Sequence, residues 1–307
     1  MGTKRILTGP RFVTGYPFPL DSLSVKPLFG WSLRRLSAAY NGYSCRITRL
    51  SDNASIDVGF VGNDWDSATA LAFCAGTDGF ITICYDQSGN NNNSIVQQFN
   101  GASITQGSLK IISGGSLFTW GGKPAGIMLG PAGLFYATTG GVTEPAQPMS
   151  FFAVTGAPGN IASSGNQSLF APLGFFGKSA VQLEFVPYVS GQLTVPGLSL
   201  NFQDGQLPTG ITTVAPLTLG AGIFAGGRWG GNNYTVYAGG LVNSGNFDFT
   251  TFNVNTNYVS GGSVLGSSYG QFMFNYFSES FWFPGVYLSD SDVNVLKISA
   301  QTYFNVL

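Results

Sequence analysis

The sequence predicts an all-β fold in which two sheets pack as a sandwich, and three observations support this class. The 44 glycines among 307 residues, with many Ser, Thr and Asn residues, suit short strands joined by tight turns. Beyond residue 100, apolar stretches alternate with turns that contain Gly, Pro or Asn, as in sandwiches and barrels. The one strong helix pattern lies at the end of the chain, at residues 288–307. A single sandwich of this length can enclose one core.

The first third of the chain has the least regular patterns. Residues 1–30 hold four prolines and little periodicity, so we expect an extended N-terminal arm that makes assembly contacts. Residues 31–40 fit either a short helix or an edge segment of a sheet. A short helix is predicted over residues 64–76, with Asp64 or Asp66 as its N-cap.

The rest of the chain predicts strands and a closing helix. Strand patterns occupy residues 44–50, 79–90, 108–113, 125–130, 149–156, 180–189, 191–202, 215–227, 233–242 and 271–288. The closing helix is expected to begin after Ser289 or Ser291, with Asp290 or Asp292 in its first turn. We therefore expect two regions, the arm at residues 1–30 and one sandwich at residues 31–307.

The charge content is unusually low. Charged residues make up 9% of the chain, against roughly 25% in an ordinary soluble domain. Two explanations fit this number: a neutral surface rich in Ser, Thr and Asn, or a surface covered by sibling subunits. Eight of the 13 basic residues lie before position 50, but they are too dilute, at a net charge of −1, to indicate nucleic-acid binding.

Several classes of chemistry are excluded by residue type. The chain contains no histidine, which removes serine–histidine, cysteine–histidine and histidine–metal mechanisms, and we expect no metal and no cofactor. Its three cysteines do not form a disulfide framework. The N-terminus lacks an apolar signal-peptide core, and no apolar run is long enough to span a membrane.

A stretch of about 60 residues resembles a known family. The sequence from Trp31 to Asn90, above all Tyr85-Asp86-Gln87-Ser88-Gly89-Asn90 after a short apolar strand, is similar to the opening of the α-L-arabinofuranosidase B catalytic domain. It also resembles a related module of bacteriophage structural proteins. The resemblance implies a concanavalin A-like jelly-roll sandwich with a short C-terminal helix.

The resemblance also implies where catalytic groups are expected. Glu184 stands where the family has its glutamate nucleophile, but Ser267 and Ser268 occupy the late loop that should carry the aspartate acid/base. The nearest acidic residues in sequence, Asp248 and Glu279, do not fall at the corresponding position. The family's half-cystine partner of Cys74 corresponds here to Gly79.

Two other groups of residues are candidate ligand-binding sites. A glycine-flanked segment offers aromatic rings and polar donors suited to a glycan, or else a loop anchor: Arg228, Trp229, Asn232, Asn233 and Tyr234. Asp86 and Asn90 fit either a cradle for a sugar hydroxyl or calcium ion, or a turn in which they bind nearby backbone groups.

These observations predict a non-catalytic virion structural protein, such as a capsid decoration, head fibre or tail component, located in the virion and made in the host cytoplasm. We expect a homo-oligomer that contacts other virion proteins through residues 1–30, with a cell-surface glycan as a further partner and with neither nucleic acid nor membrane. The alternatives are a glycoside hydrolase or depolymerase of the arabinofuranosidase type that uses Glu184, and a free lectin.

Overall fold

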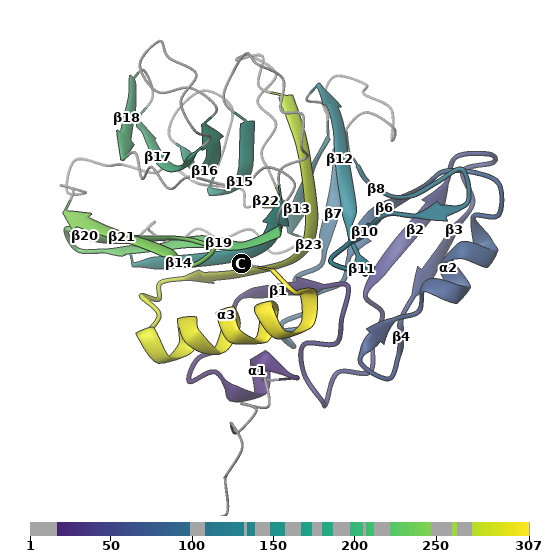
Figure 1. Cartoon of the computed structure of the whole chain (residues 1–307), viewed down its shortest axis with the longest axis horizontal. Helices are drawn as coiled ribbons and strands as arrows, with labels where there is room; N and C mark the ends of the chain where they lie inside the picture. The colour runs from purple at the N-terminus through teal and green to yellow at the C-terminus, as the bar shows by residue number, and fades with distance from the viewer. Residues whose placement is uncertain are drawn as a thin grey trace, which may run out of the picture.

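The computed structural model describes residues 17–98, 108–131, 134–138, 148–156, 167–173, 180–186, 197–204, 207–211, 222–246, 260–262 and 272–306. Within these residues the chain is a β-sandwich whose strands pair antiparallel, with one helix of 15 residues near the C-terminus (Figure 1). The predicted all-β sandwich with a short C-terminal helix is confirmed.

The larger sheet is built around one long central strand, β23 (Phe272–Pro284). Its strands are ordered β21 (Leu241–Asn246), β20 (Asn233–Ala238), β19 (Gly222–Gly230), β14 (Met149–Gly156), β23, β12 (Gly126–Pro131), β8 (Leu109–Ser113), β6 (Gly79–Cys84), β7 (Ser94–Gln98), β13 (Leu134–Thr138) and β22 (Ser260–Gly262). Beside this path, β1 (Phe29–Ser32) pairs with β23, β2 (Cys45–Arg49) with β3 (Ser55–Val58) and β6, and β9 (Ser116–Leu117) with β8.

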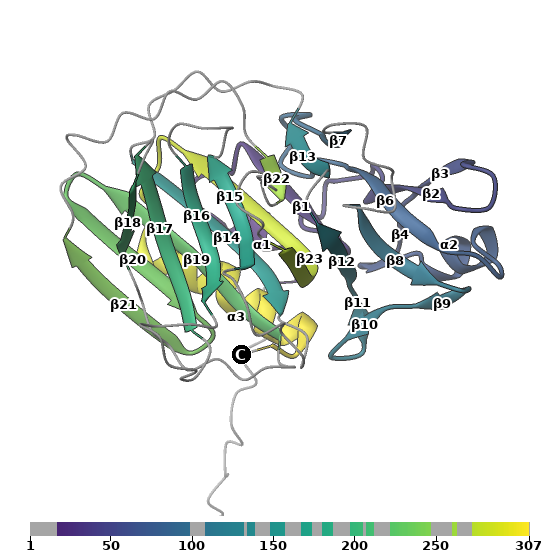
Figure 2. The same cartoon turned by 90° about the horizontal axis from the view of Figure 1, so that it is seen from above.

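The second sheet has four strands and lies over one end of the larger sheet. Its order is β15 (Gln167–Leu173), β16 (Ala180–Val186), β17 (Gly197–Asp204) and β18 (Leu207–Ile211). Two short hairpins complete the strands: β4 (Phe60–Val61) with β5 (Asp64–Trp65), and β10 (Thr119–Trp120) with β11 (Lys123–Pro124). Figures 1 and 2 show the four-stranded sheet stacked over β14 and β19–β21, while β2, β3, β4 and helix α2 lie at the opposite end.

Three helices are present in the described chain, and the two predicted ones are confirmed. Helix α2 (Ser67–Phe73) is capped by Asp66, whose side chain accepts from the backbone N–H of Thr69. Helix α3 (Asp290–Phe304) is capped by Ser289. Helix α1 (Pro19–Ser22) is a single turn inside the segment predicted to be extended. The helix considered for residues 31–40 does not form, because its first residues belong to strand β1.

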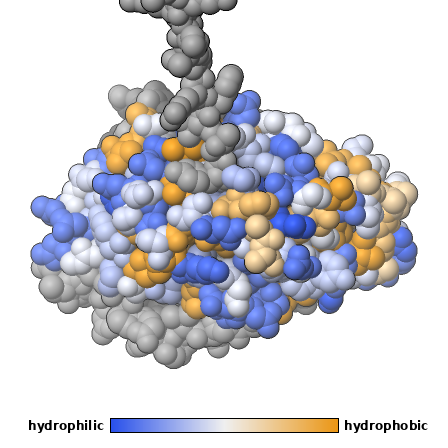
Figure 3. Space-filling model, turned by 90° about the horizontal axis from the view of Figure 1, so that it is seen from below, coloured by the Kyte–Doolittle hydropathy of each residue, from blue (hydrophilic) through white to orange (hydrophobic). Residues whose placement is uncertain are grey.

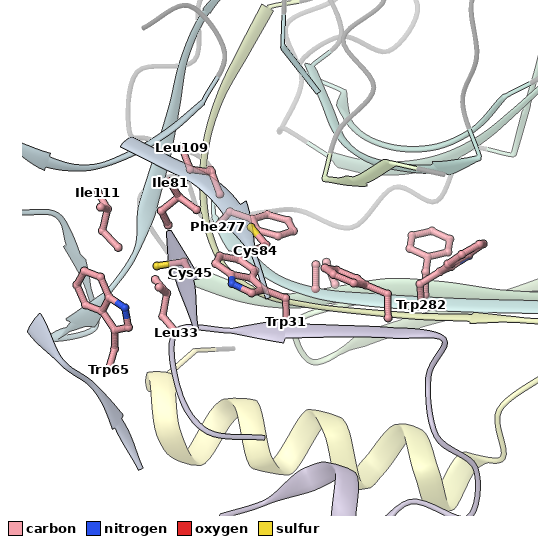
Figure 4. Packing of buried hydrophobic residues seen from close by; sticks show 14 of the residues in the cluster. Trp31, Leu33, Cys45, Trp65, Ile81, Cys84, Leu109, Ile111, Phe277 and Trp282 are labelled. Carbon is pink, nitrogen blue, oxygen red and sulfur yellow. The ribbon is translucent and has the colours of Figure 1, made fainter. Parts of the chain in front are cut away.

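The core lies on both faces of β14 and β23, which explains why β14 is buried at every position. One cluster, which includes Trp31, Phe277 and Trp282, lies on the face that is turned away from α3 (Figure 4). The other cluster packs beneath the sheet against α3. A strand that is covered on both faces has a continuous apolar sequence. Burial on both faces of such strands uses much of the 44% hydrophobic content.

Part of the predicted arm packs on the same chain. Leu20 is buried in the cluster beneath the sheet, and Ser24 donates through its N–H and its hydroxyl to Asp292 on α3, at 2.8 and 2.6 Å. Strand β1 crosses the predicted boundary at residue 30. Residues 1–16 lie outside the described part of the chain, so the division at residue 30 and the assembly contacts stay a prediction.

Gly79 lies beside the thiol of Cys74, as the family resemblance implies for a lost half-cystine. A Cβ atom placed on Gly79 would lie 2.6 Å from the Cys74 Sγ atom. We therefore expect Gly79→Cys to form a disulfide with Cys74 under mild oxidation and to raise the free energy of unfolding by about 2 kcal/mol, as closure of a short loop predicts. Thiol counting and thermal unfolding with and without reductant check this. Gly79→Ser is the matched control, and an oxidised Gly79→Cys protein in which every thiol is still free would contradict the expectation.

Candidate functional site

Glu184 lies on an inner strand of the four-stranded sheet. It sits in β16, opposite Ser168 of β15 and Ser199 of β17 in the strand register. Polar and apolar residues alternate along β16 and β17. Gln182 and Glu184 stand opposite Asn201 and Ser199, whereas the positions that alternate with them in β16 are Val181, Leu183 and Phe185. Directly opposite positions share one face of a sheet, so the register places Glu184 in a polar row.

Glycosidase chemistry needs a second carboxylate, and most acidic residues of this chain are engaged elsewhere. The chain has 14 acidic residues. Ten of them accept hydrogen bonds from partners outside the strand of Glu184: Asp21, Asp52, Asp57, Asp64, Asp66, Asp78, Asp86, Asp290, Asp292 and Glu279. This leaves Glu144, Asp204 and Asp248 as partners for Glu184.

Glu279 is engaged in a buried ion pair. The Arg34 Nε and Nη2 atoms donate to its two carboxylate oxygens at 2.7 and 2.9 Å, and the Ser32 hydroxyl donates to it at 2.8 Å. The Arg34 Nη1 atom donates to the Ser299 hydroxyl at 2.8 Å. Both charged side chains are almost fully buried. Glu279 is therefore part of the core and has no access to a substrate.

The strand register also separates Asp204 from Glu184. Ser199 is opposite Glu184, and Asp204 lies five residues further along β17. At about 3.4 Å per residue this is roughly 17 Å of backbone, more than the roughly 5–9.5 Å that glycosidase carboxylates span. Glu144 and Asp248 lie outside the described residues, as do Ser267 and Ser268.

The segment around Arg228 and Trp229 is a strand pair and not the glycine-flanked loop that the sequence suggested. Arg228 and Trp229 lie in β19, and Asn233 and Tyr234 lie in β20. Glycine is needed in β19 for close packing, since a Cβ at Gly226 would collide with the Phe151 carbonyl oxygen.

Arg228 and Trp229 are both buried. Trp229 packs edge-to-face on Phe151, with ring centroids 5.7 Å apart. Arg228 donates to the Leu288 carbonyl oxygen and to Asp290, and its guanidinium lies 4.7 Å from the centre of the Tyr287 ring. These contacts hold the start of α3 against the sheet.

The hairpin turn is more accessible. Asn232 and Asn233 are exposed, and Tyr234 is half-buried. A ligand-binding role for Arg228, Trp229, Asn232, Asn233 and Tyr234 stays a prediction, and the three residues at the turn are the ones that a ligand can reach.

Asp86 and Asn90 bind backbone groups of their own chain. Asp86 accepts from the N–H groups of Gly30 and Ser88, both at 2.9 Å, and from the Ser88 hydroxyl at 2.7 Å. The Asn90 side-chain amide donates to the Pro27 carbonyl oxygen at 2.9 Å. These contacts are those of the predicted turn, and they tie residues 27–30 to the end of β6. A ligand role for the two residues remains a prediction.

Neither a metal cluster nor a membrane span was found among the described residues. No group of three or more His, Cys, Asp or Glu side chains is arranged to hold a metal ion in this part of the chain. No helix in it is long and apolar enough to cross a membrane.

Comparison with known proteins finds similarity to arabinofuranosidases. The family model described as "Alpha-L-arabinofuranosidase B, catalytic" matches residues 30–157. No curated protein sequence matches the chain. The resemblance to the arabinofuranosidase catalytic domain is therefore confirmed, while a resemblance to phage modules is not shown.

Solved arabinofuranosidase structures share the fold. A GH54 α-L-arabinofuranosidase soaked with a cyclic sulfate inhibitor has a TM-score of 0.64 and 19% identity, over 92% of this chain and 65% of its own. An arabinofuranosidase complexed with arabinofuranosyl-α-1,2-xylobiose has a TM-score of 0.62 and 18% identity, over 92% and 64%. The chain thus spans about 65% of the length of the structure matched first.

The prediction of a non-catalytic virion structural protein located in the virion is wrong, because the match is to a glycoside hydrolase catalytic domain. The observations behind it are compatible with an enzyme. Retaining glycosidases use two carboxylates and need no histidine. A low charge content does not distinguish a virion surface from any other neutral one.

Proposed function

We propose that the chain is a glycoside hydrolase of the arabinofuranosidase type, with Glu184 as its nucleophile and arabinofuranosyl substituents of a polysaccharide as its substrate. The match of residues 30–157 to an arabinofuranosidase catalytic model carries this proposal. The shared fold over 92% of the chain and the inner-strand position of Glu184 support it. The matched enzyme complexed with arabinofuranosyl-α-1,2-xylobiose suggests arabinose linked to xylan as the substrate.

The proposed mechanism is double displacement. Glu184 attacks the anomeric carbon of the arabinofuranosyl group and forms a covalent glycosyl-enzyme, while a second carboxylic acid protonates the departing oxygen. The second residue, now a carboxylate, then removes a proton from water. The activated water cleaves the glycosyl ester, which releases arabinose and regenerates Glu184. Elimination of the engaged acidic residues leaves Glu144 and Asp248 as candidates for this second role, although the late loop of the family corresponds to Ser267 and Ser268 here.

The test is hydrolysis of 4-nitrophenyl α-L-arabinofuranoside by the wild-type chain and by Glu184→Gln. We expect the variant to lose activity by a factor on the order of 10³ or more, because an amide cannot form the glycosyl ester. Asp52→Asn, a change of an exposed carboxylate paired with Arg49, is the matched control and should retain full activity. The same assay on Asp248→Asn and Glu144→Gln identifies the second carboxylate.

Two outcomes would contradict the proposal. Activity that survives Glu184→Gln in a folded protein would exclude this residue as nucleophile. Binding of arabinoxylan with no hydrolysis of any arabinoside by the wild-type chain would favour the free lectin that the sequence left open.

A further inference from the structure

Four aromatic side chains form a contiguous surface cluster at the end of the molecule that carries β2, β3, β4 and α2. We define Tyr40, Tyr43, Phe60 and Tyr85 as the aromatic patch. The ring centroids of Tyr43 and Tyr85 are 6.0 Å apart, and those of Tyr40 and Phe60 are 6.3 Å apart. The Tyr40 hydroxyl donates to the Tyr43 carbonyl oxygen at 2.8 Å, which joins the two pairs.

The aromatic patch is accessible to a large ligand. The Tyr43 side chain is 51% exposed, and the other three residues are half-buried. Val61, next to Phe60, is 66% exposed. Figure 3 shows hydrophobic residues on several parts of one face, the end that carries β2, β3, β4 and α2 among them. A single exposed apolar residue is ordinary, whereas contiguous apolar surface marks a binding site. Tyr43 is the exposed member of four linked rings, three of which are half-buried.

Charged partners fix one side of the aromatic patch. The Tyr85 hydroxyl donates to Asp57 Oδ1 at 2.6 Å. The Arg46 Nε and Nη2 atoms donate to both oxygens of Asp57, at 2.7 and 2.9 Å. Such a network holds the Tyr85 ring in one orientation before any ligand arrives, which lowers the entropic cost of binding.

The ionisation states near the patch are set by the same contacts. The hydrogen bonds from Arg46 lower the pKa of Asp57. Burial, and then the hydrogen bond to Asp57, raise the pKa of Tyr85. Burial, aided by the charge of Asp86, raises the pKa of Tyr40 to about 12. At neutral pH the surface therefore offers protonated phenols beside an ionised carboxylate and guanidinium.

Two glycines lie beside rings of the aromatic patch. A Cβ on Gly42 would lie 2.5 Å from the Tyr40 hydroxyl oxygen, so a side chain there would displace the hydroxyl from Tyr43. Gly59 lies against the Tyr43 ring, and a Cβ there would be 3.7 Å from it. Gly42 therefore preserves the contact between Tyr40 and Tyr43, while the space beside Gly59 would accept a Cβ in ordinary van der Waals contact.

We infer that the aromatic patch, with Arg46 and Asp57 at its edge, is a second, non-catalytic binding site for a neutral polysaccharide, an inference that rests on the proposed function. Sugar rings present C–H faces that stack on aromatic rings and hydroxyl groups that bond to charged planar side chains. The patch offers both kinds of partner. Rings with phenolic hydroxyls and an Arg46 side chain that is 41% exposed favour a glycan over an aliphatic protein surface.

The position of the patch suits a role beside the proposed active site. Glu184 lies in the four-stranded sheet over β14 and β19–β21, and the aromatic patch lies at the other end of the larger sheet (Figures 1 and 2). A polymer bound at the patch is retained on the enzyme between cleavage events. A short aryl arabinoside has no portion that reaches both ends, so the patch is expected to affect polymeric substrates alone.

The test is binding of soluble arabinoxylan by affinity electrophoresis, with Glu184→Gln as the background so that the polymer is not degraded. We expect Tyr43→Ala to weaken retention by at least about fivefold, the effect of a central aromatic contact. Tyr43 contributes only its backbone oxygen to Tyr40, so this variant keeps the internal hydrogen bonds. Leu241→Ala, which removes a side chain that is 47% exposed on the edge strand β21, is the matched control.

The outcomes separate this inference from the proposed function. Retention lost in Tyr43→Ala and kept in Leu241→Ala supports the patch, even where the wild-type chain hydrolyses no arabinoside. Equal retention by both variants overturns it, as does failure of the Glu184→Gln protein to bind arabinoxylan. Reduced cleavage of 4-nitrophenyl α-L-arabinofuranoside by Tyr43→Ala made in the chain that keeps Glu184 also overturns it, because the site would then act on the chemical step.

Discussion

Glu279→Gln is expected to lower the free energy of unfolding by about 3–5 kcal/mol, the usual cost of removing one partner of a buried ion pair. The glutamine side chain matches glutamate in size, so the loss comes from charge and hydrogen bonding. Arg34 would keep its charge with no carboxylate in a site where its side chain is 2% exposed. Its other contacts, with Ser299 and the rings of Tyr303 and Phe304, do not neutralise it.

Chemical denaturation monitored by tryptophan fluorescence measures this loss. Asp52→Asn makes the same chemical change in a pair whose side chains are 32% and 48% exposed, and is expected to cost far less because water screens the charges. The double variant Arg34→Met with Glu279→Leu should recover much of the loss, because two apolar groups leave no unpaired charge. If the denaturation midpoint of Glu279→Gln were no lower than that of Asp52→Asn, the Arg34–Glu279 pair would not be needed for stability.

Local patterns in the sequence predicted many of the longer strands and the two longer helices, whereas β3, β7, β13, β15, β18 and β22 were not predicted. Three features depend only on neighbours a few residues away in sequence. They are the alternation of residues 44–50, the continuous apolar run at residues 149–156 and the Ser289 cap of α3. The choice between helix and strand at residues 31–40 was decided by pairing with β23, whose register partners lie about 250 residues later in the chain. Propensity within a short window carries no information on such a partner.

The surroundings of the candidate site residues were less predictable for the same reason. Arg34 and Glu279 are 245 residues apart in sequence, so their pairing follows only from the packing of β1 and β23. Glu279 lies between serines in a long aromatic strand, which is a signal of a buried, compensated charge in a chain with so few charged residues. Gly226, Gly227 and Gly230 suggested a loop at Arg228, whereas close approach to β14 explains the glycine at position 226.

The Asp86 turn also shows how a motif can identify a fold through contacts with its own backbone. Gln87 accepts from the N–H of Leu36 at 2.8 Å and donates to the carbonyl oxygens of Ser32 and Arg34, at 2.9 and 3.1 Å. Its own N–H donates to the Gly30 carbonyl oxygen at 2.7 Å. Residues 86–90 therefore take the place of a paired strand along the outer edge of β1, and satisfy backbone groups that burial would leave without partners.

Asp86→Ala is accordingly expected to lower the free energy of unfolding by roughly 3 kcal/mol, since the buried N–H groups of Gly30 and Ser88 lose their acceptor. Asp66→Ala removes a carboxylate from a helix cap that water can reach, and should cost about 1 kcal/mol. Thermal unfolding compares the two variants, and hydrogen exchange at Gly30 locates the effect, because opening of β1 speeds exchange there. Equal losses, with Gly30 still protected, would mean that Asp86 does not hold β1, and would favour the ligand-binding interpretation of the turn.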